Sequence, residues 1–231
     1  MPATAIDAVI TSRMSVRAFV ERPVGEGILA ELLQCAAAAC RAADHPVCKV
    51  HVLQGRSRAS LSDKACAAHD AARHDPALAH QYREQYDYYP QTWVSPFIER
   101  RRENGWGLYG LLSIGKGDKD RMHAQHQRNY LFFGAPVGLV FTMKQSLDAN
   151  CVLRCGMFVQ SVMLAARARG LDTCPHAAWN VFASIVLPHV GAAPGHFLVC
   201  CMSLGYADRS APVNAYVTPR LPVSEFARWL D

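Results

Sequence analysis

Apolar residues recur at helical spacing over much of the chain. This pattern predicts helices over 4–11, 28–39, 57–73, 97–114, 118–133, 157–169 and 179–189, with a short amphipathic helix over 224–230. The helix over 157–169 is apolar nearly all round and ends at Gly170. We therefore expect it to be covered on both sides, by the rest of the core or by a partner chain.

Three segments have the pattern of strands. Residues 49–53 alternate between apolar and polar side chains, and 137–143 and 197–204 are continuous apolar runs that are typical of buried strands. Residues 79–96 are rich in Tyr, Gln and Pro and have no clean period, which indicates an excursion from the core. With no internal repeat and no linker, 1–231 is interpreted as a single α+β domain.

Composition narrows the class of protein. Of the 231 residues, 51% are hydrophobic and 19% are charged, which excludes a disordered chain. The longest uncharged apolar run, 132–143, is shorter than the ~20 residues of a membrane helix. No secretory signal is evident, so we expect a cytoplasmic protein without a membrane partner. The net charge of +5 is spread along the chain, without the basic stripe and stacking aromatics of a nucleic-acid binder.

Cysteine and histidine pairs do not by themselves predict a metal site. The nine cysteines contain no Cys-x-x-Cys pair, and their odd number favours reduced thiols over a disulfide framework. Three pairs lie about one helical turn apart: Cys151 with Cys155, His123 with His126, and Cys66 with His69. Because zinc needs about four converging ligands, we interpret each pair as core or surface and predict no metal.

Two glycine motifs imitate nucleotide-binding loops. Residues 105–110 satisfy Gly-x-Gly-x-x-Gly, but a charged segment precedes them where a dinucleotide fingerprint requires a strand. Residues 110–116 imitate a phosphate loop, but Gly117 follows where Ser or Thr is required. We reject both. The commonest hydrolase and zinc-protease signatures are absent from the sequence as well.

A stronger candidate lies near the amino terminus. Arg13, Ser15 and Arg17 alternate directly after the first predicted helix. In an extended segment these side chains point the same way and form an anion-binding clamp, since guanidinium groups suit phosphate. The alternative is a set of surface arginines near a helix end.

Several segments, taken in order, resemble the FMN-dependent nitroreductases, and within them the nitrobenzoate-reductase-like members. The first is Ser12 to Phe19 with Pro23-Val24, and the longest is Gly156 to Gln160 with Met163 to Pro175. Gly134-Ala135-Pro136, Ser203 to Asp208, Asn214 and Arg220-Leu221-Pro222 complete the resemblance in the family's order.

The resemblance implies a fold and an activity. The expected fold is α+β, with a mostly antiparallel sheet flanked by helices, in an intertwined homodimer that holds FMN at the subunit interface. The implied activity passes electrons from NAD(P)H through FMN to a small aromatic acceptor, nitro- or quinone-like, in a ping-pong cycle. Residues from about 79 to 130 correspond to the family's variable lid.

The resemblance also assigns site residues. Arg13, Met14, Ser15 and Arg17 would hold the FMN phosphate and ring edge, with Arg220 closing on the phosphate. The turn of Pro175, His176, Ala177 and Ala178 would present a backbone N–H to flavin N5, which makes His176 and Ala177 the catalytic candidates. The lid aromatics Trp106, Tyr109 and Tyr130 are assigned either to stacking on the acceptor or to packing within the lid.

Some family positions are substituted in this chain. Asp44 stands where the family has an amide that donates to the flavin, and Pro46 replaces a Gln, with Cys48 nearby. Val217 replaces a second phosphate-proximal Arg. Two alternatives follow: a divergent member that binds another ligand or serves as a partner subunit, or a specialised biosynthetic flavoenzyme in which Asp44 or His45 transfers a proton.

Overall fold

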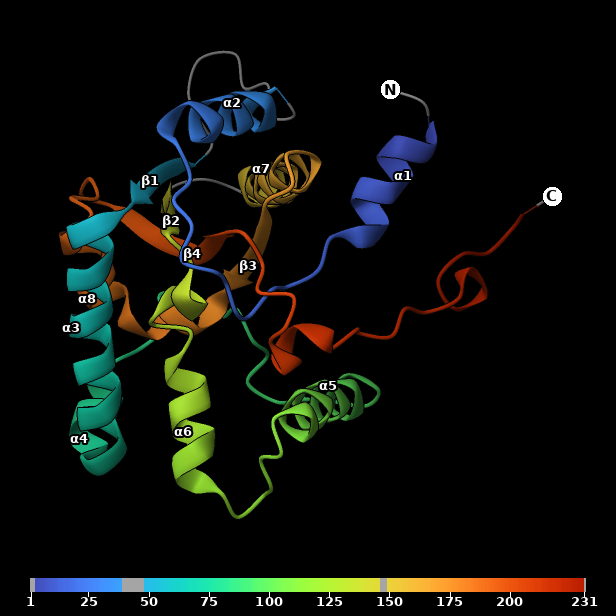
Figure 1. The fold of residues 1–231 in the computed structure, drawn as a ribbon. Helices are drawn as coiled ribbons and strands as arrows, with labels where there is room; N and C mark the ends of the chain where they lie inside the picture. Colours follow the sequence, from blue (N-terminus) through green and yellow to red (C-terminus); the bar gives the residue numbers. More distant parts are fainter. Residues whose placement is uncertain (1–2, 39–47, 146–148, 231) are drawn as a thin grey trace.

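An antiparallel sheet forms the centre of the computed structural model, which describes residues 3–38, 48–145 and 149–230 (Figure 1). Within these residues its order is β1-β2-β4-β3, and each neighbouring pair is antiparallel. The strands are β1 (Lys49–Leu53), β2 (Val137–Lys144), β3 (Asp172–His176) and β4 (His196–Gly205). The predicted strands over 49–53, 137–143 and 197–204 are confirmed. The expected α+β class with a mostly antiparallel sheet is confirmed as well.

Strand β3 was not predicted, because its residues do not have a strand pattern. It contains Asp172, Thr173, Pro175 and His176, and polar residues with a proline favour a loop. In the structure Asp172, Thr173 and His176 are all buried, and their polar groups have partners inside the protein. The tertiary contacts therefore override the local pattern.

The sheet is surrounded by helices. They are α1 (Ala3–Ser12), α2 (Glu26–Ala37), α3 (Gly55–His74), α4 (Pro76–Gln81), α5 (Phe97–Leu111), α6 (Lys119–Gln127), α7 (Ala149–Ala168) and α8 (Ala183–His189). Four 3-10 turns are η1 (Phe132–Gly134), η2 (Ala177–Phe182), η3 (Pro212–Ala215) and η4 (Val223–Glu225).

Several predicted helices differ in extent from the observed ones. The helix predicted over 157–169 begins earlier, because α7 spans Ala149–Ala168. The helix predicted over 118–133 ends at Gln127, because Phe132 and Phe133 have φ of 50° and 53°, in the left-handed region. The helix predicted over 224–230 is reduced to the single turn η4 in an otherwise irregular segment. The region predicted as one helix over 179–189 is divided between η2 and α8.

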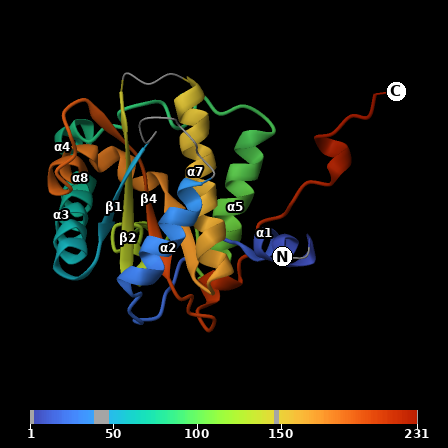
Figure 2. The same cartoon turned by 90° about the horizontal axis from the view of Figure 1, so that it is seen from above.

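The two faces of the sheet bury different helices (Figure 2). On one face α2 and α7 pack against alternate strand residues such as Leu139 and Met202. On the other face α3, η2 and α8 pack against Val140 and Cys201. Side chains along a strand point alternately to opposite faces of the sheet. Because both faces are covered by helices, β2 and β4 need apolar residues at successive positions, and their sequences contain such continuous apolar runs.

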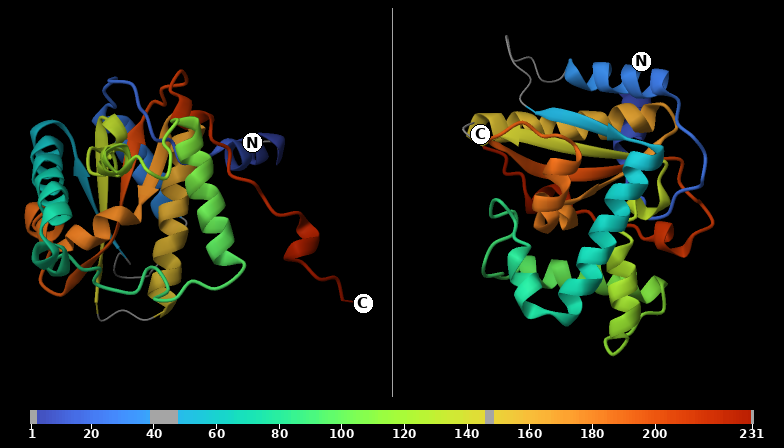
Figure 3. Two further views of the ribbon diagram at one scale, coloured as in Figure 1. Left: turned by 90° about the horizontal axis from the view of Figure 1, so that it is seen from below. Right: turned by 90° about the vertical axis from the view of Figure 1, so that its left-hand side faces the viewer.

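The segment expected to form a lid contributes α4, α5 and α6. In the side view of Figure 3 these helices extend below the sheet, away from α2 and α7. Helix α4 begins at Pro76, where the Asp75 carboxylate accepts from the N–H groups of Ala77 and Leu78. The single-domain division and the lid boundaries at about 79 and 130 stay predictions.

Helix α7 and the C-terminal segment leave apolar side chains uncovered. By length and composition α7 could span a membrane over Cys151–Ala168, of which 28% is buried. One side of α7 packs in the core through residues such as Val162 and Ala166, as in a helix of a globular fold. After η3 the chain first lies against α5, where Thr218 to Leu221 line a cavity with residues of that helix, and its last part runs away from the body (Figures 1 and 2). Its most exposed apolar residues are Val217, Phe226, Trp229 and Leu230.

Candidate active site

The segment that carries the clamp (Arg13, Ser15 and Arg17) is extended along β3. Ser15 forms a parallel bridge with Thr173, and the N–H of Val16 donates to the carbonyl of Thr173 at 3.0 Å. Val16 is fully buried, whereas the three clamp residues are half-buried. This pattern of burial fits an extended segment in which Val16 faces the core, and the shared direction of the clamp residues stays a prediction.

Asn214 holds this segment in position. Its side-chain oxygen accepts from the N–H of Arg17 at 2.7 Å, and its amide nitrogen donates to the carbonyls of Ala18 and Asp208, both at 2.8 Å. A single amide thus joins the clamp to the loop after β4. Asn214 belongs to a segment that resembles the family, but its role was not visible in the sequence.

The guanidinium groups of Arg13, Arg17 and Arg220 belong to this region of the fold. Arg13 and Arg220 lie close to each other. Burial lowers the pKa of Arg13 most, and the positive charge of Arg220 lowers it further. Within residues 3–38, 48–145 and 149–230, neither of them nor Arg17 forms an ion pair with a carboxylate. Like charges that converge without a partner favour an anionic ligand.

A buried thiol lies behind the clamp. Burial raises the pKa of Cys174 to about 11, opposed by the charges of Arg17 and Arg13 and by a hydrogen bond from Ser15. All three clamp side chains therefore approach the same sulfur atom, at the middle of β3. The thiol is protonated at neutral pH, so it leaves the positive charge of the clamp uncompensated.

Asp172 anchors the strand on which the clamp lies. Its carboxylate is 3% exposed and accepts from Arg167 at 3.1 Å and from Arg209 at 2.9 Å. Arg167 also donates from Nε to Ser12 Oγ at 2.9 Å, directly before Arg13. The pair of arginines thus connects α7, β3 and the amino-terminal segment.

The turn predicted to face a ligand follows β3 directly. His176 pairs with Cys201 in the sheet, and η2 begins at Ala177. The first N–H groups of a helix have no acceptor within it, and Ala177 and Ala178 occupy these positions in η2. Pro175, Ala177 and Ala178 are half-buried, at the end of β3 near the clamp.

The side chain of His176 belongs to the core and not to a ligand site. It is 3% exposed, and its ring nitrogens contact Ser203 Oγ at 2.7 Å and Asn129 Oδ1 at 3.2 Å. Its ring also stacks on Phe133, with centroids 4.8 Å apart. Any catalytic contribution of His176 therefore falls to its main chain, while its imidazole positions the turn. Met14 is similar, because its side chain packs against the core.

Burial sets the protonation of His176 and predicts a pH effect on stability. Burial, followed by the charge of Arg17, lowers the pKa of His176 to about 3, so its imidazole is neutral in the folded protein at neutral pH. Between that value and about 6.5 only the unfolded chain takes up the proton, so the free energy of unfolding falls as the pH falls.

The variant His176→Gln isolates this effect. When the pH is lowered from about 7.5 to about 5, His176 alone should reduce the free energy of unfolding of the wild type by about 2 kcal/mol. In His176→Gln this contribution to the pH dependence should be absent. Urea denaturation of both proteins at both pH values provides the measurement. The same pH dependence in the two proteins would contradict this assignment.

A cavity of about 200 Å³ opens beside the clamp. It is lined by Arg17, by Tyr109 of α5, and by Asn129 and Phe133, which both contact His176. The left-handed backbone of Phe133 costs about 1–3 kcal/mol in a residue with a side chain, and here it places the ring between the cavity and His176. Asn129 and Phe133 were not predicted as site residues, because both fall in the helix predicted over 118–133.

The three lid aromatics have different positions. Tyr109 lines the cavity, and the ring of Trp106 packs edge-on against it at 5.9 Å, so both stay candidates for contact with an acceptor. Tyr130 is buried, and its hydroxyl donates to the carbonyl of Ala178 at 3.3 Å. The assignment of Tyr130 to stacking on an acceptor is therefore wrong, because its ring packs in the core against Trp179 and Phe182.

A second cavity, of about 250 Å³, lies between α5 and the C-terminal segment. Arg220 and Tyr216 line it on one side, and Arg100 and Asn104 on the other. Its lining also includes the carboxylate of Glu103, so it combines both signs of charge. Asp44 and Pro46 lie outside the described residues, and Val217 is 78% exposed.

Sequence comparisons agree with this architecture. The sequence model of the nitroreductase family matches residues 10–206. The 4-nitrobenzoate reductase of Pseudomonas putida is 35% identical over 224 residues, which cover 97% of this chain and 95% of that protein. The nitrobenzene nitroreductase of Ectopseudomonas oleovorans is 29% identical over 225 residues, which cover 97% of this chain and 96% of that protein.

Solved structures agree as well. The FMN and NADPH-dependent nitroreductase NfnB from sphigopyxis sp. strain HMH superposes with a TM-score of 0.90 at 31% identity, covering 98% of this chain and 99% of that one. The FMN-dependent NfnB from Mycobacterium smegmatis, solved with NADPH, has a TM-score of 0.88 at 27% identity, covering 99% of each chain.

Proposed function

Because this chain belongs to the nitroreductase family, we propose that it is an FMN-dependent oxidoreductase that passes electrons from NAD(P)H to a small aromatic acceptor. The proposed acceptor is a nitroaromatic compound, as the names of the relatives suggest, or a quinone-like one. The observation that carries the proposal is the group of three guanidiniums (Arg13, Arg17 and Arg220) without a carboxylate partner in the described part of the chain.

The residues present fit the phosphate of FMN. Arg13, Arg17 and Arg220 supply the charge, and Ser15 adds a hydroxyl on the same side of the segment. Each charged hydrogen bond to a phosphate contributes about 1.5–3 kcal/mol. Neutral Cys174 beneath the clamp adds no negative charge that would compete with the phosphate.

The turn after β3 is assigned to the flavin ring. We assign the N–H of Ala177, at the start of η2, to the ring atom N5, with Pro175, His176 and Ala178 setting its position. The imidazole of His176 and the hydroxyl of Tyr130 hold this turn from inside the core. When bound, FMN supplies the two-electron carrier between the nicotinamide and the acceptor.

The cavity beside Arg17 is the proposed place for both the nicotinamide and the acceptor. Tyr109 and Phe133 offer aromatic faces to a planar ring there, and Trp106 backs Tyr109. The two molecules would use the same space in turn, so the proposed cycle is ping-pong. Initial-rate plots at several acceptor concentrations should give parallel lines, and intersecting lines would contradict this order.

The proposed active form is an intertwined homodimer. Val152, Leu153 and Met157 on α7 are half or more exposed, and Phe226, Trp229 and Leu230 in the C-terminal segment are at least 70% exposed. Such apolar surface is typical of an obligate subunit interface. A second copy of the chain would cover both regions.

One spectrum tests the proposed function. Protein purified after incubation with excess FMN and then freed of unbound flavin should be yellow, and NADH or NADPH should bleach it without air. Addition of 4-nitrobenzoate should restore the colour. Protein that stays colourless would contradict the proposal and favour a subunit that binds another ligand. Flavin that neither nicotinamide reduces would favour a specialised biosynthetic enzyme.

A further inference from the structure

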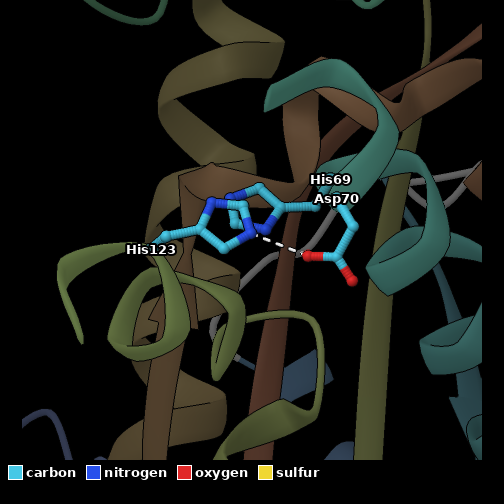
Figure 4. A group of neighbouring side chains, drawn as sticks. All are labelled: His69, Asp70 and His123. Carbon is cyan, nitrogen blue, oxygen red and sulfur yellow. Dashed lines mark hydrogen bonds and ion pairs between the residues drawn. The ribbon is translucent and has the colours of Figure 1, made fainter. Parts of the chain in front are cut away.

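Two histidines and a carboxylate meet where α3 and α6 lie side by side. His69 and Asp70 come from α3 and His123 comes from α6, and Figure 4 shows the three side chains turned toward one another. One potential ligand atom from each residue lies within 4.8 Å of the other two. In sequence the two helices are far apart, so only the fold brings these residues together.

The contacts within this group are close. His123 Nε2 lies 2.7 Å from Asp70 Oδ1, and the rings of His69 and His123 stack with centroids 4.0 Å apart and 12° between their planes. His126, one helical turn after His123, places Nδ1 3.2 Å from His69 Nε2. His69 Nδ1 is buried and has no hydrogen-bond partner in the described part of the protein.

We propose that His69, Asp70 and His123 bind a divalent transition-metal ion of the Zn²⁺ type, which joins α6 to α3. Imidazole nitrogen and carboxylate oxygen are ligands that such ions take at about 2.0–2.2 Å, so tetrahedral ligand atoms lie about 3.3 Å apart. The ligand atoms now lie within 4.8 Å of one another, so ion binding needs the stacked rings to open and the most distant ligand atoms to approach by up to about 1.5 Å. His123 Nε2 and Asp70 Oδ1, 2.7 Å apart, must instead separate slightly. Water or His126 completes the coordination.

The ligand atoms of the group suit a cation. They are two imidazole nitrogens and one carboxylate oxygen, the atoms that such ions prefer. The Asp70 carboxylate is held in place by His123 Nε2 at 2.7 Å and by the side-chain amide of Gln127, which donates to it at 2.8 Å. Arg73, on the same helix, pairs with Asp120 of α6.

The position of the site gives the ion a structural consequence. His126 lines the cavity beside Arg17 and Tyr109, and shortly after α6 come Asn129 and Tyr130, which hold the turn at His176 and Ala178. An ion that joins α6 to α3 would therefore fix one wall of that cavity. This inference does not depend on the proposed function, because ion binding is measured without flavin or nicotinamide.

Titration calorimetry with ZnCl₂ tests the site. The protein is freed of any histidine tag, treated with a chelator and desalted before the titration. We expect one ion per chain and a rise in the melting temperature, since a ligand of the folded state stabilises it. The variants His123→Gln and Asp70→Asn should each weaken binding at least about tenfold.

A matched control is His74→Gln, which removes an exposed histidine from the same helix outside the group and should leave the affinity unchanged. Asp70 is 59% exposed, so Asp70→Asn keeps the test valid if His123→Gln fails to fold. No binding by the wild type would overturn the proposal. Equal affinity in the wild type and both ligand variants would also overturn it, and would place the ion on the thiols instead.

Discussion

The double variant Arg13→Ala, Arg17→Ala is expected to emerge from purification colourless and to need at least about 100-fold more FMN for half-saturation than the wild type. The reason is the loss of two charged contacts to phosphate at about 1.5–3 kcal/mol each. The measurement is flavin fluorescence during titration of the flavin-free protein. Activity at low FMN should fall with occupancy.

This variant should still fold. The N–H of Arg17, which bonds Asn214, and the N–H of Val16, which bonds Thr173, belong to the main chain and survive both substitutions. Arg83→Ala with Arg102→Ala removes the same charge from exposed positions away from the clamp and should retain flavin. Unchanged occupancy in the clamp variant, or equal loss in the control, would show that the phosphate lies elsewhere.

The second large effect is on stability and concerns Asp172. Replacing it with Asn removes the carboxylate that Arg167 and Arg209 share and should lower the free energy of unfolding by about 3 kcal/mol. The carboxylate is buried, whereas the two arginine side chains are 24% and 59% exposed, so water partly solvates them afterwards. Urea denaturation of the flavin-free protein measures the change.

Asp120→Asn provides the matched control for this variant. Asp120 also pairs with an arginine, Arg73, but its side chain is 91% exposed, and exposed pairs contribute little to stability. Its loss should barely move the denaturation midpoint. If both variants unfold at the same urea concentration, the network around Asp172 does not anchor β3.

Flavin affinity should fall in Asp172→Asn as well, although Asp172 does not belong to the clamp. Arg167 contacts Ser12, and Ser15 and Val16 pair with Thr173, the residue after Asp172. Loosening β3 therefore moves the support of Arg13 and Arg17. A variant that is destabilised yet binds flavin as tightly as the wild type would separate the two roles.

Much of the fold follows from local patterns. Apolar periodicity identifies the long helices and three of the strands, because each buries a stripe or a face whose spacing is visible in the sequence. The alternation of Arg13, Ser15 and Arg17 was also visible, since the period of an extended segment is two. These features depend on residues that are close in the chain.

What was missed depends on contacts between distant segments. Strand β3 has polar residues that are buried because Arg167, Arg209 and Ser203 provide partners, none of which its own pattern reveals. Tyr130 was assigned to the lid, but its hydroxyl bonds Ala178 and its ring enters the core. The group of His69, Asp70 and His123 required the packing of two helices.

The course of the C-terminal segment has a consequence for how the protein would behave at low concentration. Arg220, beside Arg13, lies on the same extended stretch whose far end carries Phe226, Trp229 and Leu230. In the proposed dimer, separation of the two chains would free that stretch and remove one of the three positive charges around the phosphate. A dilute sample that has lost its flavin, and with it the yellow colour, would then reflect dissociation of the subunits and not a defective cofactor site.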